Sequence, residues 1–282
     1  MTATDKPKTC FITGGMSGLG RALAAQYLQR GADVAIFDLQ VNGDVLQALE
    51  SHRQSAAQKI VAYAASVTDS EELSGAVQQA VMAIGPPELA ISSAGIQRAQ
   101  PFEQLSGDDF EQVVQVNLFG SRNFAAAVLP SMRQGSRLAL VASMAGFTAN
   151  YSYAAYGASK FGVIGLGRVL RMEYRPRGID VSLICPPEVD TPMVVDEQKN
   201  MHPASRKLKS IGGSLSLEEA ITGILAGLDA GRAVIIPGGK AKLTYFCNRY
   251  LPDFIMNGIV DRIVDSELKK MGAAAAPAAG EP

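Results

Sequence analysis

The 282-residue chain is poor in three features that would narrow its function by themselves: cysteine, net charge and long apolar runs. Its three cysteines, Cys10, Cys185 and Cys247, are widely spaced and fit no metal-ligand pattern. With 27 acidic and 26 basic residues, the chain has no net field that favours nucleic acid or acidic lipid. No segment reaches the ~20 apolar residues of a membrane-spanning helix, and the polar stretch Met1–Lys8 leads into no apolar signal core. We therefore expect a cytoplasmic protein with no metal site and no nucleic-acid partner.

Strand-like and helix-like patterns alternate along the chain up to Gly239, which predicts a parallel sheet with helices on both faces. We expect about seven strands in a Rossmann-type, doubly wound α/β domain over residues 1–239. A helical extension at 240–271 is expected to pack on this domain, and an Ala- and Pro-rich tail at 272–282 is predicted to be disordered. The predicted strands are Thr9–Thr13, Asp33–Phe37, Lys59–Ala64, Leu89–Ser92, Arg137–Ser143, Ile179–Cys185 and Ala233–Ile236.

A glycine-rich turn, Gly14–Gly20, joins the first predicted strand to a helical pattern. Such a turn lets backbone N–H groups approach a pyrophosphate, and the N-terminus of the following helix adds a favourable dipole. Asp38 ends the next strand, about 20 residues on, where an acidic residue can bind the adenosine ribose. A glycine cluster alone is weak, because turns need glycine anyway. Strand, turn, helix and acid in this order predict a dinucleotide site.

Tyr156 and Lys160 lie four residues apart in the predicted helix Tyr153–Tyr174, and therefore on one face of it. A nearby ammonium stabilises a phenolate and lowers the phenol pKa from its reference of about 10. Ser143, at the end of an apolar strand, could hold a carbonyl oxygen next to the phenol. By themselves, Tyr156 and Lys160 could be two solvent-exposed residues on one face of a helix. Beside a dinucleotide site, the three residues predict proton transfer to a carbonyl or from an alcohol.

Together these motifs resemble the short-chain dehydrogenase/reductase family, over about Lys8–Gly239. The Val-Asn-x-x-Gly stretch of that family corresponds to Val116–Gly120, and its Pro-Gly-x-Val-x-Thr segment to Pro186–Thr191. The chain departs from the family pattern at three places: Ser66 replaces an aspartate, Ser92–Ser93 replace two asparagines, and Pro187 replaces a glycine. None of these departures removes a catalytic side chain.

The resemblance implies hydride transfer between a nicotinamide and a carbonyl carbon, for which the protein supplies orientation and the proton. It assigns Tyr156 as general acid/base, and Lys160 to lowering the pKa of that tyrosine and holding the nicotinamide ribose. It further implies that Ser143 hydrogen-bonds the substrate oxygen, and that Asn117 helps to hold a water that connects Lys160 to solvent. The implied cofactor-binding residues are Gly14, Ser17, Gly18, Leu19, Gly20, Asp38, Val67, Ala94, Gly95, Tyr156, Lys160, Pro186, Val189 and Thr191.

Asp38 favours NAD(H) over NADP(H), because a carboxylate accepts hydrogen bonds from both ribose hydroxyls but repels a 2′-phosphate. Arg21 is the nearby cation, and we expect it to be solvated. Pro186–Pro192, Ala155–Phe161 and the apolar extension resemble the 3-ketosphinganine reductase branch, which reduces a long-chain ketone and normally prefers NADP(H).

We therefore expect an NAD(H)-dependent oxidoreductase that interconverts a secondary alcohol and a ketone on a bulky apolar substrate, lipid-like or steroid-like. An NADPH-dependent 3-ketosphinganine-type reductase is the alternative enzyme. A non-catalytic dinucleotide-binding sensor or scaffold is the alternative of another class. The presence of all four catalytic residues favours an enzyme.

The predicted helix Tyr153–Tyr174 is rich in small residues, which suits close packing on its own sheet, on another subunit, or both. The resemblance implies a homodimer or homotetramer, paired through this helix and the predicted helix Ser106–Arg133. The resemblance further implies that residues Asp190–Gly213 cover the substrate. The aromatic and aliphatic cluster from Leu243 to Ile263 leaves contact with a membrane surface open, besides packing on the domain.

Overall fold

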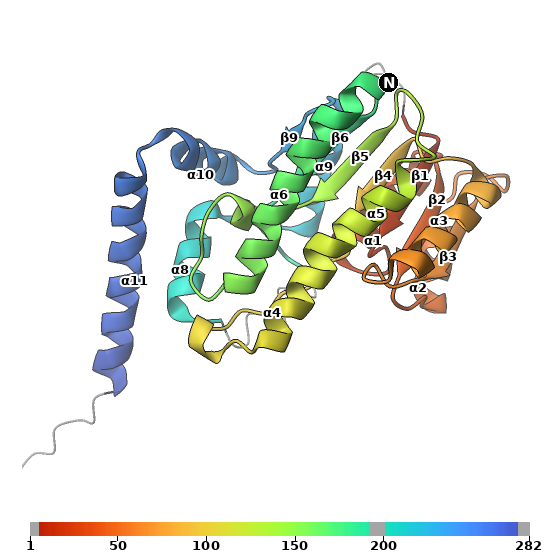
Figure 1. Cartoon of the computed structure of the whole chain (residues 1–282). Helices are drawn as coiled ribbons and strands as arrows, with labels where there is room; N and C mark the ends of the chain where they lie inside the picture. Colours follow the sequence, from red (N-terminus) through yellow and green to blue (C-terminus); the bar gives the residue numbers. More distant parts are fainter. Residues whose placement is uncertain (1–5, 192–200, 276–282) are drawn as a thin grey trace, which may run out of the picture.

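Short apolar runs form the strands of one parallel sheet in a computed structural model that describes residues 6–191 and 201–275 (Figure 1). The strand order is β3-β2-β1-β4-β5-β6-β9, so the chain reverses its direction across the sheet between β1 and β4. This confirms the predicted Rossmann-type α/β fold with seven strands. The strands are β1 (Thr9–Thr13), β2 (Asp33–Asp38), β3 (Ile60–Ala64), β4 (Leu89–Ser92), β5 (Arg137–Val141), β6 (Asp180–Ile184) and β9 (Val234–Ile235).

Helices cover both faces of the sheet because neighbouring strand residues point to opposite sides (Figure 1). On β1, Phe11 joins the core under α3 (Ser70–Ile84), α5 (Gly120–Val128) and α6 (Ala154–Tyr174). Its neighbours Cys10 and Ile12 join the opposite core. That second core lies under α1 (Gly18–Gln29), α2 (Gly43–Glu50) and α9 (Leu217–Asp229). With both faces covered, the carboxyl ends of the strands remain as the place for a site.

The long helix predicted at 106–133 is interrupted by a π-helical turn. It begins as α4 (Gly107–Val114), widens over Gln115–Phe119 and continues as α5, which ends at Val128, before the predicted end. Such π turns are frequent at functional sites. Asn117 lies in the middle of this turn and is fully buried. The helical periodicity of the sequence gave no sign of the extra residue in the turn.

The chain after β6 builds a second layer beside the carboxyl ends of the strands. Strands β7 (Glu188–Val189) and β8 (Ser214–Leu215) pair in parallel, and α8 (Pro203–Gly212) lies between them in sequence. Residues 192–200, within the predicted substrate cover, lie outside the described part of the chain.

The C-terminal extension forms two helices, α10 (Gly239–Tyr250) and α11 (Asp253–Ala275), of which α11 is the outermost helix in Figure 1. Both contact α8. Helix α11 continues past the predicted boundary at residue 271, and residues 276–282 of the predicted tail lie outside the described residues. No helix in the described part of the chain is both long enough and apolar enough to cross a membrane.

Candidate active site

One large cavity of about 850 Å³ opens at the carboxyl ends of the parallel strands. Segments that follow β1, β2, β3, β4, β5 and β6 all contribute to its lining. It therefore lies where the chain reverses between β1 and β4, the usual place for a ligand in an open α/β sheet. Of the predicted site residues, all except Asn117 line this cavity.

The glycine-rich turn has a backbone that side chains would not permit. Gly14 has φ +68°, and a Cβ atom there would lie 2.9 Å from the backbone of Ala94. A Cβ atom on Gly20 would lie 2.1 Å from the carbonyl oxygen of Gly14. The turn therefore packs tightly against itself and against the segment after β4. Its residues Gly14, Ser17 and Gly18 line the cavity at the start of α1, where the side chain of Ser17 makes no capping hydrogen bond. Such a helix start suits a phosphate group.

Asp38, the last residue of β2, is fixed next to this turn. Its Oδ2 accepts a hydrogen bond from Met16 N (2.9 Å), and its Oδ1 accepts one from Leu39 N (2.8 Å). Both oxygens keep lone pairs for further donors, because a carboxylate accepts about four hydrogen bonds. Arg21 is exposed and is absent from the described lining of the cavity. The carboxylate thus dominates the charge at this end of the site.

Tyr156 and Lys160 are presented to the cavity by consecutive turns at the start of α6. Lys160 Nζ lies 5.5 Å from the centre of the Tyr156 ring and donates a hydrogen bond to Val141 O (2.9 Å). Only 5% of Lys160 is exposed, and this burial lowers the pKa of its ammonium from 10.5 to about 8. At neutral pH the group is still positively charged, and its charge favours the phenolate form of the neighbouring tyrosine.

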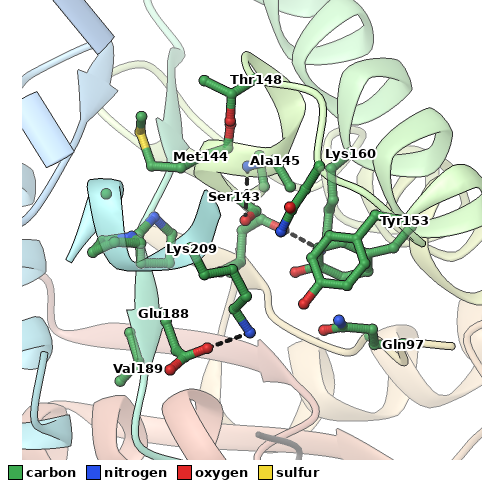
Figure 2. Close-up of a pocket in the computed structure, with 18 of the residues that line it drawn as sticks. Gln97, Ser143, Met144, Ala145, Thr148, Tyr153, Lys160, Glu188, Val189 and Lys209 are labelled. Atoms are coloured by element: carbon green, nitrogen blue, oxygen red, sulfur yellow. Dashed lines mark hydrogen bonds and ion pairs between the residues drawn. The ribbon is translucent and has the colours of Figure 1, made fainter. Parts of the chain in front are cut away.

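Ser143 lies just beyond β5, which ends at Val141 and not at Ser143 as predicted. The chain leaves the sheet here because Ser143 caps a 3₁₀ turn at Met144–Gly146, its Oγ accepting from Ala145 N (3.1 Å). Figure 2 shows Ser143 pointing into the same space as Lys160 and Tyr153. The hydroxyl keeps its proton available for an oxygen of a substrate.

Asn117 stands behind the site and fixes its walls. Its Oδ1 accepts from Ile96 N (2.8 Å), and its Nδ2 donates to Ile96 O (2.9 Å) and to Ser159 Oγ (3.0 Å). The side chain thereby ties the segment after β4 to helix α6. These bonds show a bracing role for the side chain. The predicted water between Lys160 and solvent stays a prediction.

The segments after β4 and β6 complete the cofactor end of the cavity. A Cβ atom on Gly95 would lie 3.2 Å from Asn117 Oδ1 and 3.6 Å from Lys160 Nζ, so this glycine allows close approach. A Cβ atom on Gly18 would lie 3.8 Å from the side chain of Thr191, which places these two residues on facing walls. Ala94, Pro186 and Val189 from these two segments also line the cavity, as does Val67 from the segment after β3.

Sequence reasoning missed an ion pair between Glu188 and Lys209, which lies at the substrate end of the cavity (Figure 2). It also missed Gln97 in the lining, whose Nε2 is buried without a hydrogen-bond partner in the described structure. Helices α10 and α11 form a further wall, which is mainly apolar. The residues of this wall include Leu243, Leu251, Met256, Ile259 and Val260. The apolar spacing of the extension was visible in the sequence, but the wall it would face was not.

The short chain dehydrogenase family model matches residues 8–202 of this chain. The protein belongs to the short-chain dehydrogenase/reductase family. The predicted resemblance to the 3-ketosphinganine reductase branch is also confirmed. The chain is 34% identical over 236 residues to 3-dehydrosphinganine reductase TSC10A of Arabidopsis thaliana, which covers 82% of this chain and 71% of the relative. It is 32% identical over 240 residues to TSC10B of the same plant, with coverage of 83% and 71%.

Solved structures of this family share the fold. Levodione reductase superposes with a TM-score of 0.73 at 27% sequence identity, over 83% of this chain and 97% of that structure. As a short-chain dehydrogenase, the protein is an oxidoreductase that acts on CH–OH groups with NAD or NADP. The close approach at Gly14 and Gly20 and the uncapped start of α1 fit such a dinucleotide.

Three of the four residues that the family resemblance assigns to catalysis, Ser143, Tyr156 and Lys160, line the cavity of this dehydrogenase. When bound, the nicotinamide supplies or accepts the hydride. Tyr156, to which the family resemblance assigns the proton transfer, and Ser143, to which it assigns the hydrogen bond to the substrate oxygen, line the same cavity. Lys160 keeps positive charge beside the phenol, and Asn117 braces the wall behind them. Positioned proton transfer of this kind contributes roughly 10²–10⁴-fold in rate.

Proposed function

We propose that the protein is an NAD(H)-dependent dehydrogenase that interconverts a ketone and a secondary alcohol on a long-chain, lipid-like substrate. The observation that carries this proposal is the extent of the cavity. It continues from Asp38 and the glycine-rich turn, past Ser143 and Tyr156, to the apolar wall of α10 and α11. A dinucleotide fills only the first part of such a cavity, which leaves the second part for an apolar chain.

The choice of NAD(H) is supported by the charges at the β2 end. The carboxylate of Asp38 is held by two backbone N–H groups and has no basic neighbour among the described lining residues after β2. Two unit charges at ~4 Å and an effective dielectric of about 20 repel by about 4 kcal/mol, an upper guide for a solvated site. Even a third of this repulsion disfavours a 2′-phosphate by about tenfold in affinity.

The choice of a long-chain substrate is supported by two independent facts. The wall of α10 and α11 brings aliphatic side chains to the cavity, among them Leu243, Leu251, Ile259 and Val260. The two Arabidopsis relatives are named 3-dehydrosphinganine reductases. A 3-ketosphinganine-type reductase that prefers NADPH is the second candidate, and it differs from our proposal at the cofactor.

The test is a steady-state assay of the purified full chain with long-chain and short-chain ketones, using NADH and NADPH on each. We expect NADH to give the higher kcat/KM, by tenfold or more, and long-chain ketones to exceed short-chain ones. Asp38→Ala should narrow or invert the cofactor preference, while Asp44→Ala, an exposed acid at the start of α2, should leave it unchanged. A parent enzyme that prefers NADPH would replace our proposal by the second candidate.

We also propose that the enzyme is a homodimer or homotetramer, paired through α6 and the helix formed by α4 and α5. Gly162 and Gly167 are used inside the subunit, since Cβ atoms there would meet Leu118 and Leu183 at 2.7 and 2.6 Å. Other positions of α6 lie open. Phe161 and Val169, four positions before and after Gly165, and Met172, three positions further on, are exposed apolar residues. Light scattering of the parent and of Phe161→Glu tests the proposal, which fails if the parent is a monomer at micromolar concentration.

A peripheral membrane contact through the extension is our remaining proposal for partners. Helix α10 exposes aromatic side chains beside basic ones: Phe246 and Tyr250 with Lys242 and Arg249. Phe254, at the start of α11, is 76% exposed. Aromatic and basic residues together suit the surface of an anionic bilayer. Co-sedimentation with anionic vesicles should therefore exceed that with neutral vesicles, and Lys242→Gln with Arg249→Gln should abolish this difference. Phe246→Ser with Phe254→Ser should weaken sedimentation with both kinds of vesicle.

A further inference from the structure

Buried polar atoms without a partner gather on two segments near the start of α6. In the part of the chain that the structure describes, three such side-chain atoms occur: Gln97 Nε2, Asn150 Oδ1 and Ser152 Oγ. The segments that carry them are joined by a hydrogen bond from Gln100 N to Ser152 O (3.0 Å). A buried polar group destabilises the fold unless a ligand or a water pairs with it. The concentration of three in one place therefore indicates a site for a polar group.

The second of these segments has a strained backbone. Ser152 has φ +66°, a left-handed conformation that residues other than glycine rarely adopt, and no other non-glycine residue among those described has a positive φ. Such strain persists only where the surrounding structure holds it, often at ligand sites. Here Gln100 N holds Ser152 O, and Tyr153 N donates to Asn150 O (3.3 Å). These bonds fix the segment that brings Asn150 to the cavity.

Gln97 and Asn150 belong to a polar wall of the cavity that carries no charge. Both line the cavity, and Gln112 of α4 adds a third carboxamide to the lining. Gln112 Oε1 accepts from Arg98 Nη2 (3.3 Å), so this side chain is already paired. Arg98 also forms an ion pair with Asp109 (3.3 Å), and neither ion is among the described lining residues. We call Gln97, Gln112 and Asn150 the amide wall.

The cavity has an apolar wall on another side. Helices α10 and α11 bring to it the aliphatic side chains of Leu243, Ile259 and Val260. In Figure 1, α4 and α11 lie on opposite sides of α8, and α8 contacts both α10 and α11. The amide wall and the apolar wall therefore bound the cavity from different directions.

The residues assigned to the carbonyl lie between these two walls. Tyr156 adjoins Tyr153, with 5.8 Å between their ring centres, and Figure 2 shows Gln97 beside Tyr153. On the other side, the turn that begins at Ser143 leads to Phe147, whose ring contacts an aromatic ring of α10 with 4.7 Å between centres. A ketone at Ser143 and Tyr156 would thus place one substituent toward each wall.

Two unlike walls select one orientation of such a ketone. Its carbon receives the hydride that NADH gives up on becoming NAD⁺, and its oxygen receives a proton, so a secondary alcohol forms. With the oxygen held and the hydride arriving from the cofactor end, exchanging the two substituents turns the opposite face to the hydride and gives the other enantiomer. A polar substituent on the apolar wall loses its hydrogen bonds and leaves the amide wall unpaired. That orientation is disfavoured by about 10- to 100-fold.

We propose that Gln97 and Asn150 determine which enantiomer of the alcohol forms, by binding a neutral polar substituent of the ketone carbon while the other, apolar substituent lies along α10 and α11. Gln97 Nε2 donates a hydrogen bond to an oxygen of that substituent, and Asn150 Oδ1 accepts one from its hydroxyl group. This inference rests on the proposed function and deepens it, because it assigns the stereochemical outcome to the amide wall.

The first test compares two long-chain ketones with NADH that differ only in the short substituent, hydroxymethyl in one and ethyl in the other. Chiral chromatography measures the ratio of the two alcohol enantiomers. The parent should give a ratio at least about tenfold higher with the hydroxymethyl ketone. Gln97→Met and Asn150→Leu, which keep a similar volume, should each lower this ratio toward that of the ethyl ketone. Gln100→Met is the matched control, since this exposed glutamine lies on the same segment and is not among the described lining residues.

Two results of this test overturn the proposal. One is an equal enantiomer ratio for the two ketones in the parent. The other is an equal fall of the ratio for both ketones in the variants, which would show that Gln97 and Asn150 only shape the cavity and pair with water. The variants are tested singly, so that misfolding of one leaves the other to decide.

A binding measurement keeps this inference separate from the proposed function. Calorimetry with the two enantiomers of the matching long-chain 1,2-diol needs no turnover. The parent, loaded with the oxidised cofactor that it binds more tightly, should bind one enantiomer about tenfold or more tightly, and Gln97→Met should bind both alike. If no ketone is reduced, or if NADPH is preferred, the proposed function fails, and the calorimetric ratio still decides the role of the amide wall. Equal binding of both enantiomers by the parent would refute that role.

Discussion

The burial of Lys160 predicts a stability change that depends on pH in a defined window. Burial lowers the pKa of this ammonium from 10.5 to about 8 in the folded protein. Between these two values the unfolded chain binds more protons than the folded one, so the free energy of unfolding rises with pH. The stability contributed by this group is complete above the unfolded value and is lost as pH falls through about 8.

The magnitude follows from the size of the pKa difference. At about 1.4 kcal/mol for each pKa unit, keeping the buried ammonium charged at pH 7 costs the apo protein about 3 kcal/mol. Replacing it by methionine removes this cost and the hydrogen bond to Val141 O, while filling a similar volume. Lys160→Met should therefore have a higher free energy of unfolding than the parent at pH 7. This advantage should shrink by about 3 kcal/mol as pH rises from 7 to 10.5.

Urea unfolding of both apo proteins checks this, followed by far-UV circular dichroism because the chain contains no tryptophan. Lys242→Met, at an exposed lysine on α10, is the control: it shows how the free energy of unfolding changes when a hydrated ammonium is removed. The quantity of interest is the difference in unfolding free energy between parent and variant at each pH. A difference that stays constant from pH 7 to 10.5, within ~0.5 kcal/mol, would show that Lys160 is hydrated, contrary to our reasoning.

Three further outcomes are expected. Tyr156→Phe should keep NADH binding but lose turnover by at least about 100-fold, because only the proton-transferring hydroxyl is removed; turnover within a few-fold of the parent contradicts this. Gly20→Ala should weaken NADH binding and lower the melting temperature, since its Cβ would lie 2.1 Å from Gly14 O, and Gly75→Ala, where nothing lies within 4 Å, is the control. Removing residues 240–282 should reduce kcat/KM for long-chain ketones far more than for short-chain ones, because Leu243 and Val260 line the wall; equal losses would assign the extension to folding alone.

The sequence predicted the sheet well because its strands are read locally. Strands β1 and β4 begin and end where their apolar runs do, and the glycine-rich turn carries its own geometric demand. Strand β5 ends two residues before its predicted end because Ser143 caps the following turn with its hydroxyl. The apolar pattern of the sequence does not indicate this hydrogen bond. The π turn at Asn117 escaped prediction because the side chain of this residue bonds to Ile96 and Ser159, which are distant in the sequence.

The two halves of the candidate site also differ in how far the sequence predicted them. Its cofactor half is made of short motifs, each following one strand, so parallel order brings them together. Its substrate half is made by contacts between distant segments, such as Glu188 with Lys209 and Phe147 with Tyr245. No spacing rule links such residues, because the two members of each pair lie on different elements far apart in the sequence. Charge on a lone acid or lysine in the sequence gave no reason to pair them.

The two backbone hydrogen bonds of Asp38 make position 38 a poor place for a single-residue redesign. Its carboxylate joins the end of β2 to Met16 within the glycine-rich turn, in addition to facing the cavity. An exchange to a residue without a side-chain acceptor takes the partner away from Met16 N and Leu39 N at once. A lineage that altered this position would need a second change in the turn to hold its shape. A change at position 38 is therefore expected to occur together with a change in the turn Gly14–Gly20.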